Sequence, residues 1–169
     1  QPLVMGILNV SHDSFSDGGE YTYVQAAVAR AKQMVEEGAL IIDVGGESSR
    51  PGSDSVSVEE ELSRVLPVVR EVLKLDCIVS VDTMKPDVAK ACLEAGVHII
   101  NDISGFRDPS MIAVCKEYAP HGIGCIVMHM KGMPKTMQQH VSYTDVIGEV
   151  FSFLEERAGL LAGAGIHQV

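Results

Sequence analysis

The feature that most constrains the fold is a regular alternation of short apolar runs with longer amphipathic segments. Five runs are rich in Val, Ile, Leu and Ala: residues 3–8, 39–44, 77–81, 97–100 and 124–128. Each has the length of a strand, and each is almost continuously apolar instead of alternating with polar residues. Such strands are typical of a parallel sheet that is covered on both faces.

Segments with apolar residues at helical spacing separate these runs, at residues 24–37, 58–75, 87–95, 110–118 and 145–162. Gly38 and Gly96 are expected to end the first and third of them. Ser57 and Glu60 form a capping-box pattern at the start of the second, in which Pro67 should introduce a kink. Five strand–helix units in series predict a parallel α/β protein, either a doubly wound sheet or a (β/α)8 barrel.

Polar side chains at the ends of the runs favour the barrel. They are Asn9, Asp43, Asp82, Asn101 with Asp102, and His129. In a barrel, the carboxyl ends of the strands meet on one face, where the active sites of this fold lie. No Gly-x-Gly-x-x-Gly pattern opens the first helix, which argues against a dinucleotide-binding sheet. The alternative explanation for any one of these residues is that it only caps the end of its strand.

The length fits one domain, residues 1–169, but only part of a barrel. A complete (β/α)8 barrel usually needs ~250 residues, whereas this chain has 169 residues and five units. Residues 165–169 look like the beginning of a sixth strand. The sequence therefore predicts a C-terminally incomplete barrel, whose edges are covered by the rest of a longer protein, by a partner or by a swapped copy.

Charge and composition argue against several kinds of partner. The formal net charge is −10, and a nucleic-acid-binding protein needs a basic face. No apolar run reaches the ~18 residues of a membrane span, and no signal peptide opens the sequence given, so the cytoplasm or an organelle matrix is expected. The four cysteines contain no Cys-x-x-Cys pair and are expected to be reduced core thiols.

Two polar loops have the composition of metal or anion sites. Residues 9–19 supply Asn, Ser and Asp oxygens that suit Mg²⁺, and two glycines at their end allow motion. Residues 45–52 supply paired glycines, hydroxyl groups and the Arg50 guanidinium, whose geometry matches phosphate. Asp82 and Asn101 together could bind the donor and acceptor edge of a flat heterocycle. The alternatives are solvated loops, with Arg50 paired to Glu47 or Asp54.

Taken together, these segments resemble the dihydropteroate synthase family. The matching stretches are GILNVSHDSFSDGG (6–19), IIDVGGESSRPG (41–52), SVDT (80–83), INDISG (100–105) and MHMKGMPKTMQ (128–138). The resemblance implies a (β/α)8 barrel that condenses 6-hydroxymethyl-7,8-dihydropterin diphosphate with 4-aminobenzoate. The products would be pyrophosphate and 7,8-dihydropteroate, in folate biosynthesis, and sulfonamides would compete with the aminobenzoate. The family also suggests a homodimer.

The resemblance assigns roles to the residues that hold the two substrates. Asn9 would hold the Mg²⁺ that sits on the diphosphate. Ser49 and Arg50 would contact the diphosphate and the aminobenzoate region, and Asp82 and Asn101 would bind the pterin edge.

The remaining predicted site residues surround these. Ile103 and Met128 would cover the face of the pterin ring, and Asp43 would lie at the floor of the pocket. Phe15 and Asp17 lie on the first loop, which would close over the aminobenzoate. Of all these residues, Phe15, Asp17, Asp43 and Arg50 are predicted to be catalytic.

Some residues depart from the family pattern. Ser11, His12 and Ser49 stand where the family has Thr, Pro and Thr. The family's Asp, Lys and Arg-x-His on later strands have no counterpart, so little or no activity is expected from 169 residues alone. Two other functions remain open: a pterin-binding methyltransferase domain and a non-catalytic barrel fragment that acts as a binding module.

Overall fold

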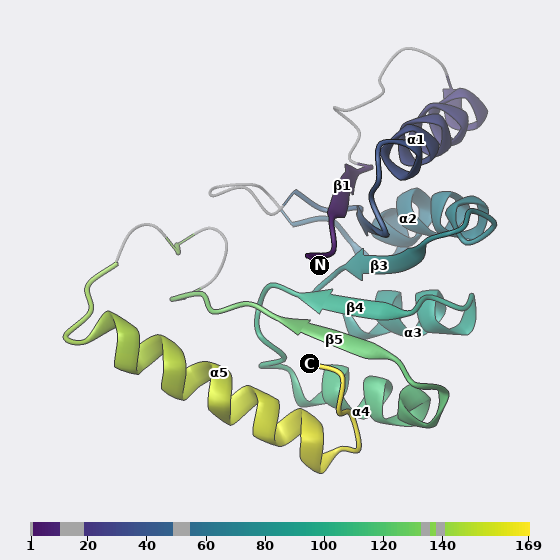
Figure 1. Ribbon diagram of the computed structural model, residues 1–169. Helices are drawn as coiled ribbons and strands as arrows, with labels where there is room; N and C mark the ends of the chain where they lie inside the picture. Colours follow the sequence, from purple (N-terminus) through teal and green to yellow (C-terminus); the bar gives the residue numbers. More distant parts are fainter. Residues whose placement is uncertain (1, 11–18, 49–54, 133–135, 138–140) are drawn as a thin grey trace.

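One parallel sheet forms the centre of the molecule (Figure 1). The computed structural model describes residues 2–10, 19–48, 55–132, 136–137 and 141–169. Five strands follow one another in the order of the chain: β1 (Met5–Asn9), β2 (Ile41–Gly45), β3 (Ile78–Asp82), β4 (Ile99–Asp102) and β5 (Gly124–Val127). This sequential order is that of a barrel, because a doubly wound sheet reverses its strand order at a switch point.

Helices connect the strands. They are α1 (Gly19–Glu36), α2 (Val58–Val72), α3 (Pro86–Glu94), α4 (Pro109–Tyr118) with the short η2 (Ala119–His121), and α5 (Val146–Gly163). Helices α1 to α4 lie side by side along one face of the sheet (Figure 1). After α5, Gly124 forms a parallel bridge with Gln168, and Cys125 donates a backbone hydrogen bond of 2.8 Å to the Gln168 carbonyl. The predicted start of a sixth strand is therefore confirmed.

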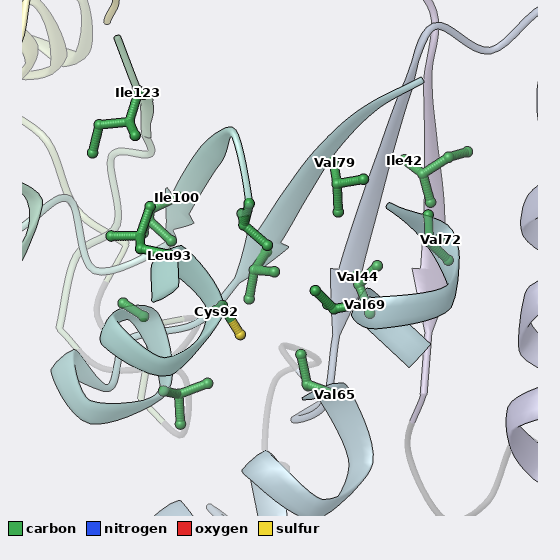
Figure 2. Packing of buried hydrophobic residues seen from close by; sticks show 14 of the residues in the cluster. Ile42, Val44, Val65, Val69, Val72, Val79, Cys92, Leu93, Ile100 and Ile123 are labelled. Atoms are coloured by element: carbon green, nitrogen blue, oxygen red, sulfur yellow. The ribbon is translucent and has the colours of Figure 1, made fainter. Parts of the chain in front are cut away.

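The core lies between the sheet and these helices. Figure 2 shows valines of α2 packed toward side chains of β2 and β3, with Cys92 and Leu93 of α3 nearby. Alternate residues of a strand point to opposite faces. Leu8, Val44 and Val81 face the helices and are buried, whereas Ile7 on the other face is 61% exposed. That second face corresponds to the interior of the expected barrel.

Some boundaries differ from the prediction. The first four strands begin and end one or two residues later than their apolar runs, so that Asn9, Asp82 and Asn101 belong to the hydrogen-bonded ladder. Helix α1 begins at Gly19 and not at residue 24, ahead of its apolar stripe. The physical reason is that backbone hydrogen bonding, not the side-chain pattern, defines these ends.

The expectations for α2 are only partly correct. The Glu60 amide donates to Ser57 Oγ at 3.1 Å, but the Glu60 carboxylate pairs with Arg64 instead of returning to the cap. The helix continues through Pro67. Ser63, whose carbonyl loses its helical partner there, lies on the exposed side, where water can replace the bond.

The four cysteines are free thiols; three of them, Cys92, Cys115 and Cys125, are buried as predicted, whereas Cys77 is only half-buried. Burial raises the pKa of Cys92 to about 12. Among the described residues, none of the helices has the length and apolar character that crossing a membrane requires.

Candidate functional site at the carboxyl ends of the strands

The strand register aligns three polar side chains in one row. Asn9 is paired with Gly45, Gly45 with Asp82, and Asp82 with Asn101. Paired residues of a parallel ladder lie side by side on the same face, which here is the face opposite the helices. The predicted convergence of Asn9, Asp82 and Asn101 is therefore what the backbone produces.

Asp43 lies one row deeper on the same face and fixes the orientation of Asn101. Asn101 Nδ2 donates a hydrogen bond of 3.0 Å to Asp43 Oδ2, and Asp43 is only 4% exposed. The Asn101 side-chain oxygen is left as an acceptor that points away from this bond. Asp43 thus lies below the row of Asn9, Asp82 and Asn101, where it holds the Asn101 side chain.

Asp82 is the group of the row whose charged form is destabilised by its surroundings. Burial, as the largest cause, and the nearby carboxylates of Asp43, Glu61, Asp102 and Glu47 together raise its pKa to about 7. The carboxyl group therefore exchanges its proton near neutral pH. A ligand that offers two N–H groups would stabilise the charged form, since hydrogen bonds to a carboxylate are stronger than those between neutral groups.

Gly45 leaves space between two side-chain oxygens, those of Asn9 and Asp82. A Cβ at this position would lie 3.6 Å from Asp82 Oδ2 and 3.7 Å from Asn9 Oδ1. Among the described residues, no group of three His, Cys, Asp or Glu could hold a metal ion. Magnesium, however, keeps several waters and uses few protein oxygens, commonly together with substrate phosphates. The amide and carboxylate oxygens here fit that pattern.

A small pocket adjoins the row. Its lining comes from the loops after β2, β3 and β4 and from α2: Glu47, Ser48, Glu61, Asp82, Thr83, Met84, Lys85 and Ile103. Ile103 therefore lies where a ring bound to Asp82 could contact it. Met128, the other residue predicted to cover the ring, directly follows β5 and is half-buried.

Three charged residues of this pocket, Glu47, Glu61 and Lys85, were not predicted as site residues from the sequence. Lys85 Nζ lies 2.5 Å from Glu61 Oε2 and also pairs with the Glu47 carboxylate. Glu61 follows Val58 by three residues and precedes Val65 by four, so it lies on the buried stripe of α2. A charged residue among the apolar residues of that stripe is the sequence feature that could have indicated a buried ion pair.

Asp102 and His129 do not belong to the row. Asp102 is fully buried, and its two oxygens accept hydrogen bonds from the amides of Ser104 (2.7 Å) and Phe106 (2.9 Å). The alternative explanation, a carboxylate that caps a loop, is thus correct for Asp102. His129 packs edge-on against Phe153, with 5.1 Å between the ring centroids.

We expect Asp102→Ala to lower the free energy of unfolding by about 3 kcal/mol, because it leaves two buried amides without acceptors. Asp108→Ala is the matched control. Asp108 accepts from the Ser110 amide at the exposed start of α4, so its loss should cost about 1 kcal/mol. Urea denaturation of both variants measures the difference, and equal losses would refute the structural role of Asp102.

Four predicted site residues, Phe15, Asp17, Ser49 and Arg50, lie outside the described residues. For them the predictions stand as made.

The fold and the row of strand-end groups define a (β/α)-barrel protein with polar side chains gathered at the carboxyl ends of its strands. A family model described as "Pterin binding enzyme" matches residues 5–169, and the chain belongs to this family. Dihydropteroate synthase of Escherichia coli (strain K12) is 48% identical over 166 residues, which are 98% of this chain and 58% of the relative. The chain therefore spans little more than half the length of this relative.

Solved structures agree in fold. Dihydropteroate synthase of Yersinia pestis, in complex with a sulfonamide drug, superposes with a TM-score of 0.86 at 42% identity, over 98% of this chain and 60% of that one. The Burkholderia cenocepacia enzyme complexed with 7,8-dihydropteroate gives a TM-score of 0.84 at 42% identity, over 98% and 55%. The five units are thus the first part of a barrel of this family.

Proposed function

We propose that this chain provides the first five strand–helix units of a dihydropteroate synthase. The reaction is the condensation of 6-hydroxymethyl-7,8-dihydropterin diphosphate with 4-aminobenzoate to 7,8-dihydropteroate and pyrophosphate. The single observation that carries the proposal is the aligned row of Asn9, Asp82 and Asn101, with Asp43 fixing Asn101. The relatives named dihydropteroate synthase and the pteroate-type ligand of one solved neighbour support it.

Asp82 and Asn101 bind the pterin in this proposal. The charged Asp82 accepts from N–H groups on one edge of the ring, and the Asn101 side chain provides the complementary polar contact. Asp43 holds the Asn101 amide so that its orientation is set before the ligand arrives. Preorganised groups of this kind cost no rearrangement when the substrate binds.

The diphosphate lies toward Asn9 in this arrangement. Mg²⁺ held by Asn9 and phosphate oxygens would neutralise the negative charge of the departing pyrophosphate. The ring itself can donate electrons to the carbon that loses pyrophosphate, so the aromatic amine needs no strong general base. Ser49 and Arg50 would contact the diphosphate and aminobenzoate, and Phe15 and Asp17 would cover the aminobenzoate; these four roles come from the family resemblance.

The test uses an extended chain, in which residues 1–169 are joined to the part of the Escherichia coli relative that lies beyond the matched region. We expect it to form dihydropteroate and pyrophosphate in the presence of Mg²⁺, with inhibition by a sulfonamide that is competitive with aminobenzoate. The unextended chain should form little or none. Chelation of Mg²⁺ should abolish the product, and Lys90→Met, on the exposed side of α3, should leave it unchanged.

No product from the extended chain, with the Escherichia coli relative active in the same assay, would contradict the proposal. Tight binding of the pterin without product would instead favour the pterin-binding methyltransferase domain. Product from the unextended chain would show that the groups of the later strands are dispensable or that a second copy supplies them.

A further inference from the structure

A charged cluster lies directly beside the proposed pterin site. The Lys85 ammonium pairs with two carboxylates, at 2.5 Å from Glu61 Oε2 and in contact with Glu47 Oε2. Glu61 is 1% exposed, and the exposed fractions of the Lys85 and Glu47 side chains are 20% and 15%. The three residues come from the loop after β3, from α2 and from the loop after β2, so the cluster joins three separate elements.

Glu47 links the two ends of the connection between β2 and α2. Its Oε2 accepts a hydrogen bond of 3.2 Å from the Val56 amide, which lies just before α2. Glu47 itself lies just after β2. The same connection carries Ser49 and Arg50 in the sequence, the two residues assigned above to the diphosphate side of the reaction.

The first residues of this connection are also fixed from α2. Arg64 Nη1 donates a hydrogen bond of 2.9 Å to the Gly46 carbonyl. Gly46 lies so close to the helix that a Cβ would be 2.5 Å from Val65 Cγ2. Lys85 is fixed on its own side, because its amide donates to Thr83 Oγ1 at 3.1 Å, one residue beyond Asp82.

The charge balance shows that Lys85 is not free to bind an anion. Burial acts to lower its pKa, but the hydrogen bonds that the ammonium donates to Glu47 and Glu61, together with their negative charges, outweigh that effect and raise the pKa. The ammonium therefore stays charged at neutral pH and is already shared by two carboxylates. A buried ion pair rarely adds net stability compared with apolar residues of the same size, so its presence here calls for another role.

We propose that Lys85 is a positioning residue, which holds Glu47 and thereby fixes the first described residues after β2 beside Asp82. This inference rests on the proposed function. Substitution of Lys85 should affect binding on the diphosphate and aminobenzoate side of the site, but not binding of the pterin edge. The ammonium acts through Glu47 and does not contact the substrate.

The first part of the test needs no enzyme activity. Hydrogen–deuterium exchange is measured on the 169-residue chain and on Lys85→Met. Because that change leaves the buried Glu61 charge unpaired, the double variant Lys85→Met/Glu61→Gln is measured as well. We expect exchange of the Val56 amide to accelerate at least about tenfold in the double variant, with β3 and β4 amides unchanged. Lys90→Met, which removes an exposed lysine paired with Glu117 at 3.6 Å, is the matched control.

The second part uses the extended chain. In the double variant, kcat/KM for aminobenzoate should fall at least about tenfold, which corresponds to about 1.4 kcal/mol. Affinity for a pterin that lacks the diphosphate should stay within about twofold, a split that general destabilisation would not produce. Lys85→Arg, which can still bridge both carboxylates, should restore most of the activity.

The outcomes separate the two proposals. An unchanged Val56 exchange rate in the double variant would overturn the positioning role, whatever the activity. Equal losses of pterin affinity and of kcat/KM would overturn it too, because Lys85 would then support the whole pocket. An inactive wild-type extended chain would count against the synthase, while accelerated exchange of Val56 would still support the anchoring of Glu47 by Lys85.

Discussion

Replacing Asp82 with asparagine is expected to stabilise the folded chain at pH 8 and, at the same time, to weaken pterin binding strongly. Burial and four neighbouring carboxylates raise the pKa of Asp82 from 3.8 to about 7. A carboxyl group whose pKa is raised by folding binds its proton more tightly in the folded state. Stability is therefore lost as the pH rises from about 4 to about 7, the window between the unfolded and folded values.

Asparagine carries no charge in either state, so the variant avoids this cost. We expect its free energy of unfolding to exceed that of the wild type by about 2–4 kcal/mol at pH 8 and to be nearly equal to it at pH 4. Urea denaturation at the two pH values measures the difference. Asp87→Asn, at an exposed position in the first turn of α3, should show no such gain. A gain for Asp82→Asn that is the same at both pH values would contradict the electrostatic cause.

The same substitution should weaken pterin binding, although it stabilises the fold. The proposed contacts of Asp82 are hydrogen bonds to a charged group, each worth about 1.5–3 kcal/mol. Asparagine keeps one neutral acceptor oxygen but loses the second acceptor and the charge, so pterin binding should weaken more than about 100-fold in the extended chain. Calorimetric titration measures this loss, and near-wild-type affinity would remove Asp82 from the site.

The second large effect is expected for Gly105→Ala, which should lower the free energy of unfolding by at least about 3 kcal/mol. Gly105 has a φ of +75° and connects β4 to α4. A Cβ there would lie 2.8 Å from the Met128 carbonyl oxygen and 2.6 Å from Phe153 Cζ. The carbonyl belongs to the backbone and cannot rotate away, so either the loop after β4 or the segment after β5 must move.

Gly122→Ala separates the two sources of this cost. Gly122 has a nearly identical φ of +76°, but nothing lies within 4 Å of its Cβ position. Its replacement should therefore show only the backbone strain, about 1 kcal/mol. Thermal and urea denaturation of both variants provide the comparison. Equal losses would mean that Met128 and Phe153 can move aside without lowering the free energy of unfolding. The close packing of Gly105 against them would then not stabilise the fold.

The sequence predicted the fold because the apolar runs of the strands are continuous and the apolar residues between them recur at helical spacing. It also predicted that Asn9, Asp82 and Asn101 meet, since parallel strand ends lie on one edge. It did not separate Asn101 from Asp102, although adjacent residues of a strand point to opposite faces. Applying that alternation would have assigned Asp102 to the helix side, where it holds the amides of Ser104 and Phe106.

The Lys85 cluster could not be predicted in the same way. Glu47, Glu61 and Lys85 are separated by 14 and 24 residues in the chain, and their pairing depends on how α2 packs against the ends of β2 and β3. Local periodicity contains no information on such contacts. Only the position of Glu61 on a buried helix face indicated that a partner charge must exist.

A crystal structure of the extended chain with 6-hydroxymethyl-7,8-dihydropterin diphosphate tests the central claim most directly. The account predicts that one edge of the ring lies within hydrogen-bond distance of Asp82 and Asn101, that Ile103 lies against its face, and that the diphosphate is directed toward Asn9. A ring bound elsewhere, or one that leaves Asp82 and Asn101 without contact, would contradict it.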